Sequence, residues 1–155
     1  MFDHPRWVRG TFARADLDAI VAAVREAERR TAAEIRVHLE PRVPRRGGEP
    51  DPMARAREVF AALRMHETAL RAGVLIYLAL EDHKLVILGD TGIHTRVGDA
   101  YWERLRDGMV ERLRRGEARE AVVQAVAEVG AVLAREFPRR ADDTDELSNE
   151  VSLGP

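Results

Sequence analysis

Hydrophobic and polar positions alternate with different periods along this chain, and each period predicts a different element. Residues 16–31 place apolar side chains three and four apart behind a capping Asp16, which predicts an amphipathic helix. Residues 33–40 alternate strictly, with an apolar face and a polar face, which predicts a strand that is half covered at best. The continuous apolar run Val74–Leu80 instead predicts a central strand buried on both faces.

The remaining pattern completes an α/β order. Residues 53–65 carry an apolar helical stripe, and Leu85–Leu88 follows the central strand after the polar turn Glu81–Lys84, which predicts a hairpin. Asp99 is the expected cap of the next helix, and a long Ala/Val helix follows Gly116. The order αβαββαα predicts a three-layer αβα sandwich with a small mixed central sheet and a right-handed parallel crossover.

Composition and charge narrow the classes of partner. The 155 residues are 45% apolar, which suits one domain; we place it at residues 12–138, followed by an acidic tail, 139–155, that we expect to be extended or disordered. A net charge of -2 gives no bias toward nucleic acid or anionic membranes. No apolar run is long enough to span a membrane, so we expect a soluble, cytoplasmic protein without a membrane span. The absence of Cys excludes disulfides and thiolate chemistry.

Three motif-like stretches do not carry their usual chemistry. Residues 65–70, MHETAL, lack the second His of a zinc protease helix. The glycines of GDTGIHTRVG, residues 89–98, have neither Rossmann nor phosphate-loop spacing. The acidic DDTDELSNE, residues 142–150, lacks the spacing of an EF-hand loop. These stretches predict no nucleotide, zinc or EF-hand site.

Topology brings Asp90 near other polar residues. The third strand runs antiparallel to the first two, so Glu34, Arg71 and Asp90 should meet at one sheet edge, with Glu28 and Thr31 near them. Clustered carboxylates repel unless a cation offsets the repulsion, and calcium suits such oxygen ligands. We therefore expect Glu34 and Asp90 to hold any metal. The alternative is that Arg71 simply pairs with Glu34 while Asp90 makes a turn.

Other positions are weaker candidates. Gly92 would let the backbone approach a ligand beside Arg71, so both are candidate substrate contacts. Asp82 lies in a second oxygen-rich corner at the hairpin turn. Arg36 and His38 should be at least partly accessible in the monomer, since a buried unpaired charge would cost several kcal/mol, and any full cover should come from another subunit.

The chain also resembles a known family. EAERRTAAEIRVHLE, RMHETALRAGVLIYLALEDHKLVILGDTGI and AREFPRRADDTDELSNEVS are similar in order and spacing to the TPM domain family, over about residues 12–152. The resemblance implies an αβα sandwich and a divalent metal site near the sheet edge. Family members include acid phosphatases of the photosynthetic lumen, calcium binders and accessory proteins of membrane complexes. Where many relatives have Arg-Asn-Gly, this chain has Arg71-Ala72-Gly73, without the Asn amide as a ligand or substrate contact.

Two functions remain open. The first is a non-catalytic interaction or accessory module, with or without calcium, that contacts an unknown protein partner or a second copy as a homodimer. The second is a metal-assisted acid phosphatase acting on phosphomonoesters, in which Glu34 and Asp90 hold a divalent cation and Arg71 steadies the phosphoryl oxygens. The sequence offers no obvious nucleophile, which favours the first.

Overall fold

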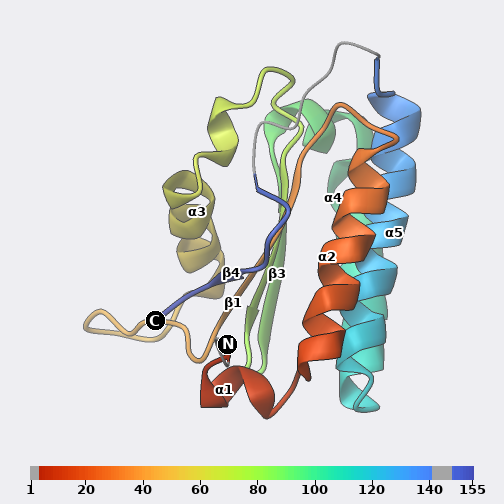
Figure 1. Ribbon diagram of the computed structural model, residues 1–155. Coiled ribbons are helices and arrows are strands. Elements are labelled where there is room, and N and C mark those ends of the chain that lie inside the picture. Colours follow the sequence, from red (N-terminus) through yellow and green to blue (C-terminus); the bar gives the residue numbers. More distant parts are fainter. Residues whose placement is uncertain (1–3, 141–147) are drawn as a thin grey trace.

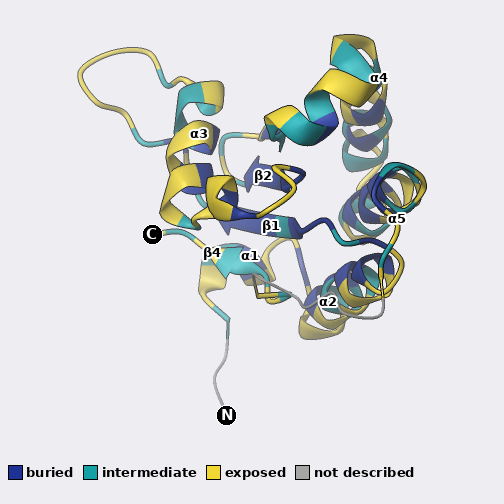
Figure 2. Ribbon diagram, turned by 90° about the horizontal axis from the view of Figure 1, so that it is seen from above, coloured by how far each residue is buried: buried dark blue, intermediate teal, exposed yellow. Residues whose placement is uncertain are grey.

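A computed structural model describes residues 4–140 and 148–155. It is an αβα sandwich with a central sheet, as predicted: α3 covers one face, and α2, α4 and α5 cover the other (Figures 1 and 2). The elements are α1 (Arg6–Arg9), α2 (Arg14–Glu28), β1 (Ile35–Glu40), α3 (Pro52–Ala62), the short 3-10 helix η1 (Met65–Glu67), β2 (Val74–Ala79), β3 (Lys84–Gly89), α4 (Thr91–Arg114), α5 (Ala118–Glu136) and β4 (Ser152–Leu153).

The sheet has the order β3-β2-β1-β4. β1 and β2 are parallel, β2 and β3 form the predicted antiparallel hairpin, and Ile35, Val74 and Gly89 lie in register across the three strands. Every residue of β2 is buried, which confirms it as the central strand. The two faces of the sheet pack into two separate apolar clusters, a larger one under α2, α4 and α5 and a smaller one under α3.

Helix α4 begins earlier than predicted. Asp90, not Asp99, is its N-cap, and the side chain of Asp90 accepts a hydrogen bond from the backbone N–H of Thr91. The helix continues to Arg114 through a kink at Gly98, where φ is 76°. Because Gly adopts that φ without strain, Gly98 permits a break between two helical segments: an earlier one from Thr91, which the sequence pattern did not predict, and a second one that begins beside Asp99, where a helix was predicted. Asp90 is therefore both the end of the hairpin and the start of α4.

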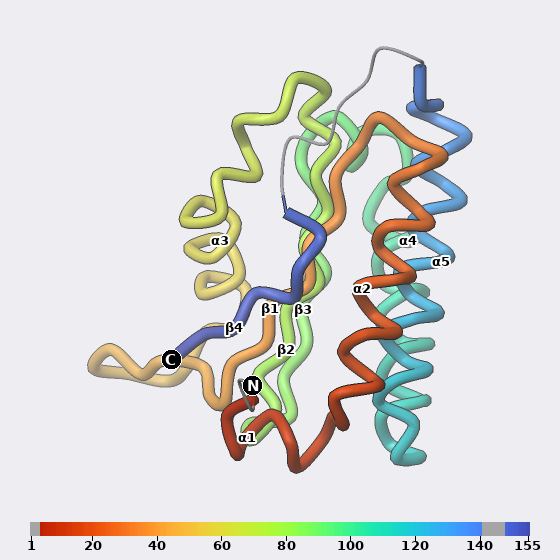
Figure 3. The backbone as a smooth tube through the Cα atoms, in the orientation of Figure 1, coloured from red at the N-terminus to blue at the C-terminus, as the bar shows by residue number. Residues whose placement is uncertain are grey.

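The polar face of β1 is covered, which corrects the prediction of a half-covered strand. Arg36 is half-buried, but His38 is only 5% exposed and Glu40 is fully buried. The cover comes from the same chain and not from another subunit: α3 lies over this face, and the C-terminal β4 pairs in parallel with the outer edge of β1 (Figure 3). The expectation that His38 is accessible is therefore wrong.

The C-terminal tail, which was expected to be extended or disordered, supplies a strand at residues 152–153. Its apolar signal is limited to Val151 and Leu153 in a polar segment, which is too short for a periodic pattern to predict the strand. The pairing is held by backbone contacts, including a hydrogen bond of 2.7 Å from the N–H of Gly154 to the carbonyl of Leu39. Most of the acidic stretch at residues 142–150 lies outside the described residues.

Candidate functional site

Backbone pairing places the three predicted strand ends in one row. The N–H of Val74 donates to the carbonyl of Glu34, and the N–H of Asp90 donates to the carbonyl of Gly73, both at 2.9 Å. Glu34 and Asp90 therefore flank the start of β2 from either side. Their backbones are roughly 10 Å apart, since each strand spacing is about 4.8 Å. The two residues lie at one end of the sheet, as strand direction predicted, but β2 separates them.

The space between Glu34 and Asp90, above Gly73, is filled by another side chain. Ile35 and Val74 face the larger apolar cluster, so strand alternation places Glu34 and Gly73 on the opposite, α3 face. There Met65 fills the space above Gly73: a Cβ on this glycine would lie 3.3 Å from the Met65 carbonyl and 3.4 Å from its Cε. Met65 is fully buried and comes from η1. Glu34 and Asp90 thus share an edge without forming a common pair of ligands.

Glu34 lies within electrostatic reach of a different arginine from the one predicted. Burial lowers the pKa of the Arg36 guanidinium, and the negative charges of Glu28, Glu150 and Glu34 act in the opposite direction. Glu34 itself is only 1% exposed. Arg36 therefore offsets part of the charge of Glu34, while Arg71 is exposed on the loop before β2.

Asp90 has one oxygen committed to the helix and one that is not. Its Oδ1 accepts the Thr91 N–H at 2.8 Å, and its backbone carbonyl accepts the N–H groups of Ile93 and His94 at 3.2 and 2.9 Å. Its Oδ2 is buried and accepts no hydrogen bond in the described part of the chain. A buried carboxylate oxygen without a partner is costly, so it is the atom at this edge best suited to a cation.

Arg71 and Gly92 form a tight backbone contact beside Asp90. Arg71 has a left-handed φ of 52°, and its carbonyl accepts the N–H of Gly92 at 2.7 Å. A Cβ on Gly92 would collide with the carbonyl oxygen of Leu70 and lie 2.5 Å from that of Arg71. Gly92 is therefore required by this close approach of two backbone segments. Strained backbone of this kind costs about 1–3 kcal/mol and is often kept at binding sites.

The three secondary candidates have structural partners. Glu28 Oε2 accepts a hydrogen bond of 2.8 Å from the N–H of Ile35, at the start of β1, where β4 does not pair with the strand. Thr31 is fully buried, and its hydroxyl donates to the Phe137 carbonyl at 2.6 Å, tying α2 to the end of α5. Asp82 lies at the other end of the sheet, where it accepts the Val43 N–H at 2.8 Å.

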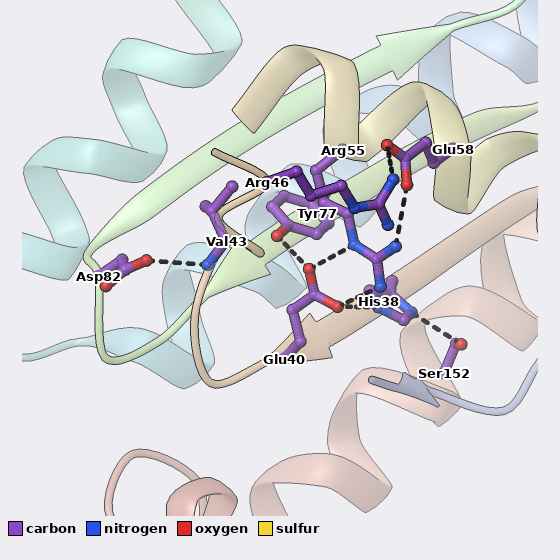
Figure 4. Close-up of polar contacts among 9 residues, drawn as sticks. All are labelled: His38, Glu40, Val43, Arg46, Arg55, Glu58, Tyr77, Asp82 and Ser152. Carbon is purple, nitrogen blue, oxygen red and sulfur yellow. Dashed lines mark hydrogen bonds and ion pairs between the residues drawn. The ribbon is translucent and has the colours of Figure 1, made fainter. Parts of the chain in front are cut away.

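Sequence reasoning missed a buried polar network centred on Glu40 (Figure 4). The carboxylate of Glu40 is fully buried and receives two hydrogen bonds from the Arg55 guanidinium, at 2.9 and 2.8 Å. The Tyr77 hydroxyl donates to the same carboxylate, and His38 Nε2 lies 3.3 Å from it. The other ring nitrogen of His38 is 2.8 Å from the Ser152 hydroxyl, which links the network to β4.

The charges of this network are fixed. Burial alone raises the pKa of Glu40, but hydrogen bonds from Arg55, His38 and Tyr77 outweigh it and lower the pKa to about 2. Burial and the neighbouring Glu40 carboxylate raise the pKa of Tyr77, so its phenol stays protonated. A permanently ionised pair beside a permanently neutral phenol stabilises the structure and is poorly suited to moving protons at neutral pH. The signal in the sequence was Tyr77, the one polar residue within the apolar run Val74–Leu80.

Two features are absent from the residues that the structure describes. No group of three or more His, Asp or Glu side chains in residues 4–140 and 148–155 lies in an arrangement that could hold a metal ion. Within the same residues, no helix combines the length and apolar character needed to cross a membrane. A cation at Asp90 would thus depend on a single carboxylate, with backbone carbonyls and water as its other ligands.

Comparison with known proteins identifies the class. The TPM domain model matches residues 8–132, so this chain belongs to the TPM domain family, as the sequence resemblance implied. The NMR structure of the BA42 protein from the psychrophilic bacterium Bizionia argentinensis is 40% identical, with a TM-score of 0.81, and the match covers 92% of this chain and 95% of that one.

A more distant structure shares the fold. The N-terminal domain of the cg2496 protein from Corynebacterium glutamicum is 16% identical with a TM-score of 0.56, over 86% of each chain. At that identity the similarity concerns the fold alone. The comparison with curated proteins finds no match.

Proposed function

We propose that this TPM domain is a non-catalytic binding module, which contacts a protein partner or a second copy of itself, and that calcium binds at Asp90. The observation that carries the proposal is the buried Oδ2 of Asp90, which accepts no hydrogen bond from the described residues. Calcium is the cation of choice because it takes carboxylate, carbonyl and water oxygens in flexible geometry.

The ligand set implies weak binding. One carboxylate oxygen is available at Asp90, and the strained turn places the carbonyls of Leu70 and Arg71 against Gly92 close by. Glu34 adds negative charge at the same edge of the sheet, from the far side of β2. Sites with few charged ligands bind calcium with dissociation constants of about 0.1–1 mM. Such a site would be occupied where calcium is abundant and would steady the loop for a partner.

The same edge is less suited to the alternative, a phosphatase. A phosphoryl group is often held by free backbone N–H groups at a helix N-terminus. At the start of α4 those groups are already used: the N–H of Thr91 binds Asp90 Oδ1, that of Gly92 binds Arg71, and those of Ile93 and His94 bind the Asp90 carbonyl. Arg71 alone would be left to neutralise the charge. This pairing supports the binding module over the hydrolase.

Thermal unfolding with added calcium tests the proposal. At about 10 mM calcium and a dissociation constant of about 1 mM, the folded state gains about 1.4 kcal/mol, which raises Tm by about 3–6 °C. Asp90→Asn should abolish the rise. Asp107→Asn is the matched control, because its side chain is 75% exposed on the same helix and its variant should respond like the wild type. An equal rise in Asp90→Asn would refute binding at Asp90.

Hydrolysis of p-nitrophenyl phosphate separates the two functions. With calcium, with magnesium or with EDTA, the wild type should turn over this phosphomonoester no faster than Asp90→Asn. Metal-dependent turnover in the wild type that disappears both in EDTA and in Asp90→Asn would instead establish the phosphatase and overturn the non-catalytic proposal.

A further inference from the structure

A cavity lies at the other end of the sheet from Asp90. It has a volume of about 700 Å³, within the usual range of small-molecule sites. It opens between the β2–β3 turn, the last turns of α4, the first residue of α5 and residues 10–11, which follow α1. In Figure 1 these segments meet at the bottom of the molecule, below the sheet. No residue of the proposed calcium site lines it.

The apolar part of the lining comes from both sides of the cavity. Leu80 and Leu85 come from the hairpin, and Val110 and Leu113 come from α4. Leu85 is buried, whereas the other three are half-buried at the margin of the larger apolar cluster. Each therefore still exposes apolar surface that a ligand could cover, at about 25 cal/mol for every Å² removed from water.

The polar part of the lining is cationic. Its charged side chains are those of Lys84, Arg106 and Arg114, with His83 and Thr11 beside them, and no Asp or Glu occurs among the described residues that line the cavity. The acidic side chains of the turn are engaged elsewhere: Glu81 binds Arg42 at 2.9 Å, and Asp82 accepts the Val43 N–H at 2.8 Å. The cavity therefore carries a local positive charge on a chain whose net charge is -2.

Lys84, Arg106 and Arg114 differ in their ion pairing among the described residues. Arg106 lies 3.8 Å from Asp107, but neither Lys84 nor Arg114 forms an ion pair with any described residue. Both are exposed at the mouth of the cavity, one on β3 and the other at the end of α4. A carboxylate placed between a lysine and an arginine gains charge-assisted hydrogen bonds.

We propose that this cavity binds an amphipathic carboxylate, the anion of a medium-chain fatty acid. The carboxylate contacts Lys84 and Arg114, and an alkyl chain of roughly eight carbons covers the exposed apolar surface of Leu80, Val110 and Leu113. The ligand must have both parts. A short anion lacks the apolar contact, and an alkyl cation is repelled by the rim.

Lys84 gives a direct measurement, because it is the only lysine in the chain. Its rate of modification by an amine-reactive reagent can be followed by peptide mass spectrometry, apart from the terminal amine. Octanoate at about 5 mM should slow modification of Lys84 at least threefold, while octylammonium and acetate at the same concentration should change it less than 1.5-fold. No protection by octanoate, or equal protection by acetate or octylammonium, would overturn the proposal.

A variant pair locates the binding. Arg114→Gln should weaken octanoate binding at least fivefold in isothermal titration calorimetry, whereas Arg104→Gln should leave it unchanged, because Arg104 is an exposed arginine of α4 that does not line the cavity. Equal affinity in both variants would overturn the assignment. The calcium response of Arg114→Gln should match that of the wild type, so failure at one site is distinguishable from failure at the other.

Discussion

Glu40 and Asp90 are two carboxylates at opposite ends of the sheet, and the protein treats them differently. Both oxygens of Glu40 receive hydrogen bonds, from Arg55, Tyr77 and His38, and the residue is fully buried. Asp90 uses one oxygen to cap α4, while the other is buried and accepts no hydrogen bond from the residues that the structure describes. The hydrogen bonds to Glu40 offset the cost of burying its charge, so this carboxylate stabilises the fold. The cost of burying Asp90 is only partly offset, so its second oxygen is available to a ligand.

The largest effect should come from removing Glu40. Glu40→Ala leaves the Arg55 guanidinium without its bidentate partner, and breaking a buried pair costs about 3–5 kcal/mol. Chemical denaturation should show this loss in the free energy of unfolding. Glu58→Ala is the control, because Glu58 also pairs with Arg55 but its side chain is 42% exposed, so about 1 kcal/mol or less should be lost. Equal losses would mean that burial does not distinguish the two carboxylates.

Acid should weaken the Glu40 network in a defined range. Hydrogen bonds from Arg55, His38 and Tyr77 lower the pKa of Glu40 from its ordinary value of 4.5 to about 2 in the folded protein. A lowered folded-state pKa gives stability that is fully present above about pH 4.5 and is lost as the pH falls toward 2, about 3 kcal/mol in all. Comparing denaturation of the wild type and Glu40→Gln across this range isolates the contribution. If the stability of the two proteins changed in parallel with pH, ionised Glu40 would not be the source of this contribution.

The Asp90 end can be probed through its backbone. Gly92→Ala places a methyl group against the carbonyls of Leu70 and Arg71, and such overpacking costs about 1–3 kcal/mol. Gly48→Ala is a suitable control, since a Cβ there meets nothing within 4 Å, and its effect should stay within about 0.5 kcal/mol. Thermal or chemical unfolding measures both. An unchanged free energy of unfolding in Gly92→Ala would show that the turn beside Asp90 is not tightly packed.

The smallest effect should come from the link between β4 and the network. Ser152→Ala removes the contact of 2.8 Å with His38 and should cost about 0.5–1.5 kcal/mol. Hydrogen exchange of the Gly154 amide, which donates to Leu39, should accelerate at the same time. Unchanged stability together with unchanged exchange would show that the serine does not hold β4 in place.

The layers and the hairpin could be predicted from the sequence because they depend on local periodicity. The apolar alternation of β1 and the continuous run of β2 both appear in the structure as buried strand faces. The cover over the polar face of β1 could not be predicted in the same way. Arg55 and Ser152 reach that face from a helix and a strand distant in sequence, and neither carries a periodic signal.

The candidate site was predictable at the level of the backbone and not of the side chains. Strand direction correctly placed Glu34 and Asp90 at one end of the sheet. Their separation depends on Met65, which fills the space over Gly73, and on Arg36, which lies near Glu34. Gly92 was expected to admit a ligand, but its space is taken by the carbonyls of Leu70 and Arg71.

Calcium binding at Asp90 can be observed at the site itself by following the backbone amides in an NMR titration with calcium. We expect saturable shifts at millimolar calcium for Thr91 and Gly92, whose amides contact Asp90 and Arg71, in the wild type but not in Asp90→Asn. Unshifted amides at this turn, or shifts that persist in Asp90→Asn, would contradict it.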